Sequence, residues 1–520
     1  MKRTRRLSSW LVGAGALGLF AGCEHLQPAP PVYPPPPPLV CPASPACAAA
    51  PESTPDAAAP AWPLETQLID LPSALRLADG QNPEIAVARE RISEALAQQE
   101  RAEVIWLPHL NYGPAWARHD GQLQKSEGQV ITTSRSSAFV GGGWALSLDL
   151  ADAIYTPLAA RQVTAARRAG AEAVAHDRLL DVALAYTDLL QVYAELQINA
   201  ETTEHARRLV ELTENYEKTG KGVAADTARA RTEASIRESE RLEIEGRSAV
   251  VSARLVQLLQ LSPELSLRPI EPALAPMAIV PEQAPLPELL AQALLNRPEL
   301  AENRALIIAT LERWRAAKVA PLVPNLWLAY EAGGFGGGPN AFFGDFSGRS
   351  DFSAMAVWHL KNLGFGDRAL QRERYAQHAQ AVFRQNVIEA DVANQVVSSF
   401  GIAFARRREL AAAQRAVADA RVSYRLNEDR IRRAPDQGRP IELLQAIQAL
   451  ALARREYLRV VADYNAAQFR LYTAMGNPPL CALEAMTKVP IKEPTVPAKP
   501  AAPELPPPAK VDEPEKPAPQ

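Results

Sequence analysis

The sequence has almost no net charge and few aromatic residues. Its 56 basic and 59 acidic residues give a formal charge of -3, and aromatic residues make up 6% of the chain. A protein without excess positive charge has no field that attracts nucleic acid or an anionic membrane surface. Beyond the first residues there is no run of about 18 apolar residues, which excludes a membrane protein built of several helical spans.

The residue patterns that catalysis needs are also missing. The seven histidines are scattered, without a His-Glu-x-x-His pair or a cysteine at ligand spacing. The glycine-rich stretches lack the Lys-Ser/Thr pair of a phosphate-binding loop, and no Gly-x-Ser-x-Gly elbow is present. We therefore predict a protein that is not an enzyme, with no metal site, no cofactor and no nucleic-acid partner.

Proline is abundant but concentrated near the two ends. Most of the 45 prolines fall between Pro28 and Pro63 or between Pro490 and Pro519. Segments of this composition bury too little apolar surface to form a core. We predict a flexible Pro-rich linker over residues 23–63 and a disordered Pro/Lys/Glu-rich tail over residues 488–520.

The first residues have the features of a secretory signal. A basic start is followed by an apolar run from Trp10 to Phe20 and by small residues before Cys23. We predict a signal peptide over residues 1–22. The residues ending in Cys23 resemble the lipobox of bacterial lipoproteins, in which the cysteine is lipidated and holds the chain on a membrane. An ordinary cleavage site and an uncleaved anchor are the alternatives.

Three further cysteines remain, at positions 41, 47 and 481. The compartment to which the signal would export the chain is oxidising, which permits disulfides. Cys41 and Cys47 have the spacing for a small disulfide loop. The alternative is that all three are incidental residues. The sequence leaves this pairing open.

The part between the two ends contains one unit twice. Asn82-Pro83-Glu84 reappears as Arg297-Pro298-Glu299, 215 positions later, and the leucine-rich segments before them match at the same shift. A period this long is a structural half used twice, not a solenoid repeat. We predict a first repeat over residues 64–281 and a second over residues 282–487, each ordered helix, strand, strand, long helix, helix.

Each half shows the same sequence of periodicities. The predicted elements of the first half are helices over residues 72–80 and 83–106, two strands between His109 and Leu150, and a long helix over residues 157–219. The second half repeats them, with a glycine-rich loop over residues 333–338 between its strands and a long helix over residues 367–434. Apolar residues in the long helices step by three and four, as at Leu179, Val182 and Tyr186, which is typical of coiled-coil packing.

The predicted strands alternate apolar and polar residues and hold many aromatic side chains, including Trp116, Trp144, Trp327 and Trp358. This pattern is typical of an outer-membrane β-barrel. A pair of soluble hairpins packed on helices is the alternative. Four strands cannot close a membrane barrel, because the smallest have about eight strands and open edges are not tolerated in lipid. The barrel must be shared between chains, and the residues alone do not select three copies over two.

Several duplicated motifs together resemble the TolC family of outer-membrane channels, the outer membrane factor lipoproteins of efflux and secretion. They are Asn82-Pro83-Glu84 and Arg297-Pro298-Glu299 at helix starts, Trp106-Leu107-Pro108 and Leu322-Val323-Pro324 at helix stops, the segment Trp358–Asp367 after the last strand, and Gly222–Asp226 and Gly438–Leu444 before the returning helices. The resemblance implies a mainly α fold with a membrane β portion and an internal duplication. Long antiparallel coiled-coil helices would form an α-barrel, and four strands per chain would contribute to a trimeric, 12-stranded β-barrel.

The same resemblance implies partners and a location. The partners are two further copies of the chain, a periplasmic adaptor (membrane fusion) protein, an inner-membrane pump and outer-membrane lipid. Residue 24 is glutamate, not the aspartate associated with inner-membrane retention in lipoproteins of this kind. We therefore expect an outer-membrane, lipid-anchored protein with a periplasmic extension.

The resemblance also assigns the turns between the long and the returning helices to the periplasmic tip. Residues matched to adaptor docking are Gly220, Gly222, Gly438, Arg439 and Pro440. Residues matched to the pore gate are Asp226, Arg439, Glu442 and Gln445, with an Asp226–Arg439 pair holding the tip shut. Gln445 departs from the aspartate of the family, which weakens any cation-binding ring. The alternative is that Asp226 and Glu442 are helix-start acids favoured by the helix dipole.

These features are compatible with two function classes. The first is an outer-membrane exit duct of a tripartite efflux pump or a type I secretion system, which passively conducts substrates from the periplasm to the exterior. The second is a lipid-anchored periplasmic coiled-coil scaffold without channel activity. The duplicated strand pairs argue against the scaffold.

Overall fold

The computed structural model describes residues 65–271, 273–281, 283–433 and 439–482, all within the compact unit Leu64–Gln520. The predicted signal peptide, Pro-rich linker and C-terminal tail lie outside these residues, as do Cys23, Cys41, Cys47 and Gly438. Among the described helices, none combines the length and the apolar character needed to cross a membrane.

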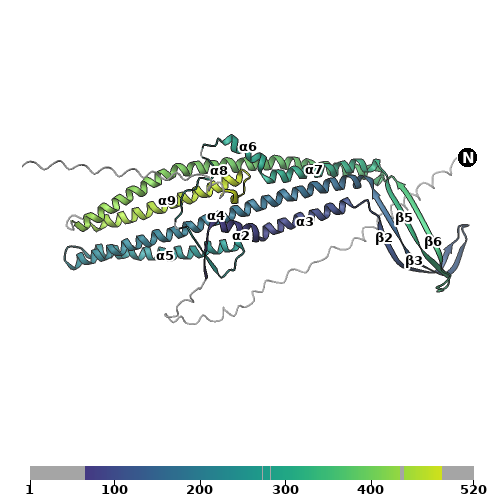
Figure 1. The fold of residues 1–520 in the computed structure, drawn as a ribbon, viewed down its shortest axis with the longest axis horizontal. Coiled ribbons are helices and arrows are strands. Elements are labelled where there is room, and N and C mark those ends of the chain that lie inside the picture. The colour runs from purple at the N-terminus through teal and green to yellow at the C-terminus, as the bar shows by residue number, and fades with distance from the viewer. Residues whose placement is uncertain (1–64, 272, 282, 434–438, 483–520) are drawn as a thin grey trace, which may run out of the picture. The chain divides into compact units, whose positions relative to one another are not determined.

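Two sets of elements follow each other in the same order along the chain (Figure 1). The first set is α2 (Leu71–Gln81), α3 (Pro83–Glu103), β2 (His109–Gln124), β3 (Val130–Asp149), α4 (Leu150–Lys218) and α5 (Ala224–Leu259). The second set is α6 (Leu286–Asn296), α7 (Pro298–Val319), β5 (Asn325–Pro339), β6 (Ser347–Val357), α8 (Phe365–Arg433) and α9 (Pro440–Ala474). Smaller elements are β1 (Glu65–Ile69), which pairs in parallel with β4 (Leu265–Pro269), and the 3-10 turns η3 (Ala320–Leu322) and η4 (Lys361–Gly364). This repeated order is what an internal duplication predicts.

The start of α4 differs from the prediction. The helix begins at Leu150 and contains Pro157 in its interior, whereas the sequence predicts a start at Pro157. The Asp149 carboxylate accepts hydrogen bonds from the backbone N–H groups of Ala151 (2.9 Å) and Asp152 (3.1 Å), which makes Asp149 the N-cap. The cap sets the start of the helix, and the proline is accommodated one to two turns later.

The helices of each set form a long antiparallel bundle (Figure 1). In the first set α3 and α5 lie along α4, and in the second set α7 and α9 lie along α8 (Figure 1). The long helix α4 also packs against α7 and α9, so it joins the two sets. The predicted seam residues Leu179, Val182 and Tyr186 are buried in the largest core cluster, which confirms the three-and-four spacing.

The strands form one antiparallel sheet in the order β2-β3-β5-β6 at one end of the helices (Figure 1). The predicted glycine-rich loop over residues 333–338 is wrong, because these residues belong to β5 and pair with β3. A Cβ atom at Gly333 would lie 2.4 Å from the Val140 carbonyl oxygen and 2.6 Å from the Gly141 Cα. Glycine is present here because β3 and β5 approach too closely for a side chain.

Candidate functional site

The two faces of the sheet differ in character. Residues paired directly across antiparallel strands share a face, and the register places Leu110 opposite Trp144, Trp144 opposite Tyr330, and Tyr330 opposite Phe352. This apolar row crosses the whole sheet. Further apolar members of the same face are Tyr112, Pro114, Trp116, Ala138, Val140, Leu146, Leu148, Leu326, Leu328, Ala354 and Ala356.

The opposite face is mainly polar and small. One row across it runs from Asn111 through Gly143 and Glu331 to Asp351. Asp351 pairs with Arg349 at 2.6 Å, and the Arg349 guanidinium lies 4.9 Å from the centre of the Phe335 ring. Alternation of an apolar and a polar face is the pattern of outer-membrane barrel strands and also of antiparallel sheets that cover a protein core.

The turn between α4 and α5 is tight. Gly220 has a φ of 72°, a left-handed conformation that favours glycine. The Gly222 N–H donates to the Tyr216 carbonyl (3.0 Å), and a Cβ at Gly222 would lie 2.9 Å from the Tyr216 Cβ. Both glycines of the predicted docking turn are therefore required by the backbone.

The predicted gate residues lie in the first turns of the returning helices. Asp226 is in the first turn of α5 and pairs with Arg229 at 3.0 Å. Glu442 is in the first turn of α9 and pairs with Arg430 of α8. Within one chain, and among the described residues, no ion pair joins Asp226 to Arg439. These positions agree with helix-start acids, and an Asp226–Arg439 pair that holds the tip shut stays a prediction.

The other tip residues of the second repeat open α9. Arg439 is the N-cap and Pro440 the first residue of the helix, where proline's fixed φ is favourable and its missing N–H costs nothing. Gln445 lies further along the same helix and is exposed. Gly438 precedes them, outside the described residues.

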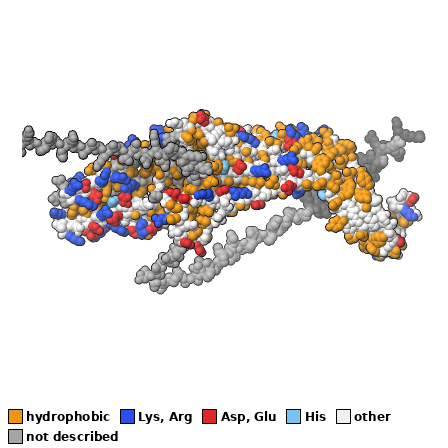
Figure 2. Space-filling view, viewed as in Figure 1, with side chains coloured by type: hydrophobic (Ala, Val, Ile, Leu, Met, Phe, Trp, Pro, Cys, Tyr) orange, Lys and Arg blue, Asp and Glu red, His pale blue; other side chains and the backbone are white. Residues whose placement is uncertain are grey.

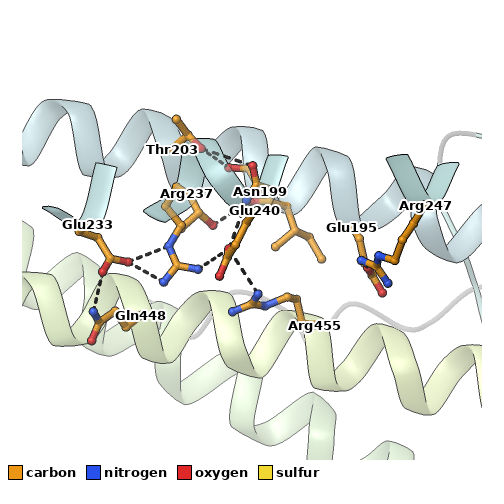
Figure 3. A network of polar contacts seen from close by, with 11 residues as sticks. Glu195, Asn199, Thr203, Glu233, Arg237, Glu240, Arg247, Gln448 and Arg455 are labelled. Atoms are coloured by element: carbon orange, nitrogen blue, oxygen red, sulfur yellow. Dashed lines mark hydrogen bonds and ion pairs between the residues drawn. The ribbon is translucent and has the colours of Figure 1, made fainter. Parts of the chain in front are cut away.

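A buried ionic network links the two sets of helices behind the tip (Figure 3). Arg237 of α5 is 7% exposed and bonds Glu233 at 2.7 Å and Glu240 at 2.6 Å. Gln448 of α9 donates to Glu233 at 2.7 Å, and Arg455 of α9 lies 3.4 Å from Glu240. Buried charges are stable only when paired in this way, so the network holds α5 against α9.

Sequence reasoning missed this network. The spacing of Glu233, Arg237 and Glu240, three and four residues apart on one helix, is a signal for ion pairing. The same spacing is common on solvated helix surfaces. Only the position of α9 shows that Glu233 and Arg237 are buried.

Two more contacts join the sets nearer the tip. The Tyr216 hydroxyl of α4 donates to the Ile431 carbonyl of α8 at 2.8 Å. The Tyr424 hydroxyl of α8 is 2.9 Å from the His205 Nδ1 of α4, and their rings are 4.6 Å apart. Burial, the largest cause, lowers the pKa of His205 and raises the pKa of Tyr424 to about 12. Both groups are therefore neutral at pH 7.

Several proteins of solved structure share this arrangement. No protein-family model matches the chain, and no curated protein matches its sequence. In structure the chain is similar to the outer-membrane channel OprN, with a TM-score of 0.68 and 17% identity over 78% of this chain and 90% of that one. It is also similar to the outer membrane protein VceC of Vibrio cholerae, with a TM-score of 0.67 and 16% identity over 78% of this chain and 96% of that one.

A third similar structure is the CmeC outer membrane channel of Campylobacter jejuni, with a TM-score of 0.66 and 14% identity over 78% of this chain and 85% of that one. This chain has the outer-membrane channel fold. The fold implied by the resemblance to the TolC family is thereby confirmed.

Among the described residues, no group of three or more histidine, cysteine, aspartate or glutamate side chains is placed to hold a metal ion. Cys481, which is described, is exposed and free.

Proposed function

We propose that this protein is an outer-membrane exit duct that passively conducts substrates from the periplasm to the exterior. It would serve a tripartite efflux pump or a type I secretion system. The observation that carries the proposal is the sheet, which has one apolar face and ends in the strands β2 and β6. The channel fold supports the same conclusion.

The dimensions of the apolar face suit a membrane. On β3 the face runs from Ala138 to Leu148, which is about 35 Å at roughly 3.3 Å per residue. A strand tilted by about 45° then crosses the apolar band of about 25 Å found on outer-membrane barrels. Beyond Trp116 the same face turns polar at Arg118 and Asp120, as expected where the sheet leaves the lipid.

The two outer strands require partners, because unpaired N–H and C=O groups are costly in lipid. Pairing of β6 in one chain with β2 in the next would close a barrel. We propose a homotrimer, in which the strands total twelve and the helices form a tube continuing the barrel into the periplasm. A periplasmic adaptor would dock at the tip around Gly220, Gly222, Gly438, Arg439 and Pro440 and link the duct to an inner-membrane pump.

Two further parts of the proposal concern the gate and the anchor. Asp226, Arg439, Glu442 and Gln445 would line the closed tip, with Asp226 and Arg439 paired between chains. Lipidation of Cys23 would hold the N-terminus in the outer membrane. Membrane anchoring by acyl chains adds about 0.8 kcal/mol per buried methylene.

Two measurements test the duct together. Light scattering of the detergent-extracted protein should give a trimer, and the same sample should form ion-conducting channels in a planar lipid bilayer. A monomer, or a trimer without conductance, would contradict the duct and favour the lipid-anchored periplasmic scaffold.

The gate has its own test. Asp226→Ala and Arg439→Ala should each raise the conductance of the closed channel, because each would remove half of the proposed pair. Arg229→Ala is the matched control, because it removes the partner that Asp226 has within the chain. Equal conductance in all three variants and the parent would show that Asp226 and Arg439 do not hold the tip shut.

A further inference from the structure

The connection between β6 and α8 has an unusual backbone. Asn362, Leu363 and Gly364 have successive φ values of 52°, 58° and 85°. Glycine and asparagine tolerate this left-handed conformation, but for leucine it costs about 1 kcal/mol or more. Such strain persists only where surrounding contacts impose it.

The turn is held by its neighbours. The backbone N–H of Lys361 donates to the carboxylate of the buried Asp367 at 2.9 Å. A Cβ at Gly366 would lie 2.7 Å from the Asn362 Oδ1, so the asparagine side chain folds back against glycine. The backbone is therefore held in a shape that the leucine itself disfavours.

The first set of elements has no such turn. There β3 runs directly into α4, with Asp149 as the cap and Leu150 half-buried. Asp149 and Val357 both pair with Asn325, so they lie at the same level of the sheet. Residues 358–364 are thus an addition that only the second set carries between sheet and helix.

The addition and the first residue of α8 expose large apolar side chains on the single chain. Exposed fractions are 60% for Trp358, 64% for Leu360, 88% for Leu363 and 69% for Phe365. Trp358 follows Ala356 by two residues and so continues the apolar face of the sheet. In Figure 2 hydrophobic side chains gather where the helices meet the strands, whereas charged side chains crowd the far end of the helices.

The segment itself carries no negative charge along the chain. Residues 352–366 contain no aspartate or glutamate. Lys361, Arg368 and Arg372 are exposed, as are the acids Asp152 of α4 and Glu373 of α8, whereas Asp367, which follows the turn, is buried. An apolar segment beside exposed bases fits the boundary of a lipid layer, where apolar groups enter the acyl chains and bases reach the phosphates.

We propose that residues 358–365 form an interfacial anchor, which inserts Leu363 and Phe365 into the lipid boundary on the helix side of the sheet. The partner is the phospholipid surface, with Lys361 near its phosphates. This inference rests on the proposed membrane insertion of the sheet. The anchor would set how deeply the duct sits in the membrane. Because it occurs once per chain, after the edge strand β6, it would lie beside one of the two subunit boundaries of each chain.

Site-directed spin labels test the anchor in the full chain. Leu363→Cys, Phe352→Cys and Phe383→Cys would be labelled separately after Cys41, Cys47 and Cys481 are each replaced by serine, and the protein reconstituted in phospholipid vesicles. Collision of each label with oxygen reports lipid, and collision with a water-soluble nickel chelate reports water. Phe352 lies on the apolar face of the sheet, and Phe383 is an exposed residue of α8.

We expect the Leu363 label to show an oxygen-to-nickel ratio several-fold above that of the Phe383 label, close to that of the Phe352 label. A Leu363 label that collides mainly with the nickel chelate would place the turn in water and overturn the anchor. Low collision with both reagents would show that a second copy covers the turn, which also overturns it. If the Phe352 label itself meets water, the proposed membrane duct fails.

A conservative variant guards against a folding defect. Leu363→Asn keeps a residue that tolerates the left-handed backbone but removes the apolar side chain. This variant should retain the parent's trimer in detergent, and a spin label at Phe365→Cys should show a lower oxygen-to-nickel ratio in it than in the parent. An unchanged ratio would count against the anchor.

Discussion

Asn82 in the first repeat and Arg297 in the second occupy equivalent positions and make the same contact with different chemistry. The Asn82 amide donates to the Leu258 carbonyl at 3.1 Å, and the Arg297 guanidinium donates to the Thr473 carbonyl at 3.2 Å. Both acceptors lie near the end of the returning helix, in equivalent places. The fold requires this tie between helices, and a neutral amide and a buried cation both satisfy it.

The two residues differ in what else they must do. Asn82 also caps α3, because its Oδ1 accepts from the Glu84 N–H at 2.9 Å. Arg297 makes no side-chain cap on α7, but it bonds Gln395 at 2.9 Å and Glu299 at 2.8 Å. The first repeat is therefore held by a cap, and the second by a buried charge that depends on α8.

The largest expected effect is that of Arg297→Ala. This change leaves the Thr473 carbonyl, Gln395 and Glu299 without their shared partner, so the free energy of unfolding should fall by about 3–5 kcal/mol. Chemical unfolding followed by circular dichroism measures it. Arg304→Ala is the control, since Arg304 is exposed and its guanidinium donates to the Leu294 carbonyl at the surface. An equal loss in both variants would contradict a special role for the buried cation.

The next largest effect is expected where the two repeats pair in the sheet, between β3 and β5. Gly333→Ala forces a Cβ against the Val140 carbonyl and should cost about 1–3 kcal/mol as the strands move apart. The matched control is Gly348→Ala on β6, where no atom lies within 4 Å of the added Cβ. Trimer yield and thermal stability in detergent report the difference. Equal behaviour of the two variants would mean that β3 and β5 adapt without cost.

A smaller effect is expected at the equivalent residue of the first repeat. Asn82→Ala removes a helix cap and one interhelical bond and should cost about 1–2 kcal/mol. Asn82→Asp separates the two roles, because aspartate keeps the cap but cannot donate to the Leu258 carbonyl. If Asn82→Asp is as damaging as Asn82→Ala in chemical unfolding, the bond to Leu258 dominates. If Asn82→Ala costs more than Arg297→Ala, the ranking of the repeats is wrong.

The smallest effect concerns pH, at the contact of the repeats near the tip. Burial lowers the pKa of His205 below its ordinary value of 6.5. The folded state, in which His205 lies beside Tyr424, therefore favours neutral histidine. Other charges facing it are Glu201 and Arg208 of α4, Glu428 of α8 and Arg454 of α9. The stability that neutral His205 contributes to the folded state is complete above about pH 6.5 and is lost as the pH falls below that value.

Acid should therefore loosen this contact, and His205→Gln should remove that part of the pH dependence. Hydrogen exchange of α4 and α8 between about pH 7.5 and about pH 5.5, which bracket the ordinary histidine pKa, measures it. Tyr424→Phe is the companion variant, because it removes the hydroxyl and keeps the ring. Identical pH dependence in the parent and both variants would show that His205 does not make this contact sensitive to pH.

The errors of sequence reasoning have physical causes. Proline suits the first turn of a helix, which favours a start at Pro157, but Asp149 already caps the N-terminus of α4. Glycine is a poor strand former, which favours a loop over residues 333–338. Their strand conformation follows from the close approach of β3, which no local pattern reveals.

Some features of the candidate site can be predicted from the sequence, and others cannot. The tip turns at Gly220 and Pro440 are predictable, because left-handed turns and helix starts need particular residues. The buried network around Arg237 is not predictable from the sequence, because its members come from the three helices α4, α5 and α9. The strained Leu363 is also unpredictable, since leucine has no preference for that backbone.

By itself, the sequence determined the duplicated order of elements, the long helices and the alternation of the strands. These follow from local periodicity, caps and turn residues, which act over a few positions along the chain. Only the tertiary structure decided the register that gathers the apolar residues on one face of the sheet, the burial of Arg237 and the pairing of His205 with Tyr424. Those features depend on which segments meet across a distance of about 200 residues, where the backbone geometry of both partners sets the contact.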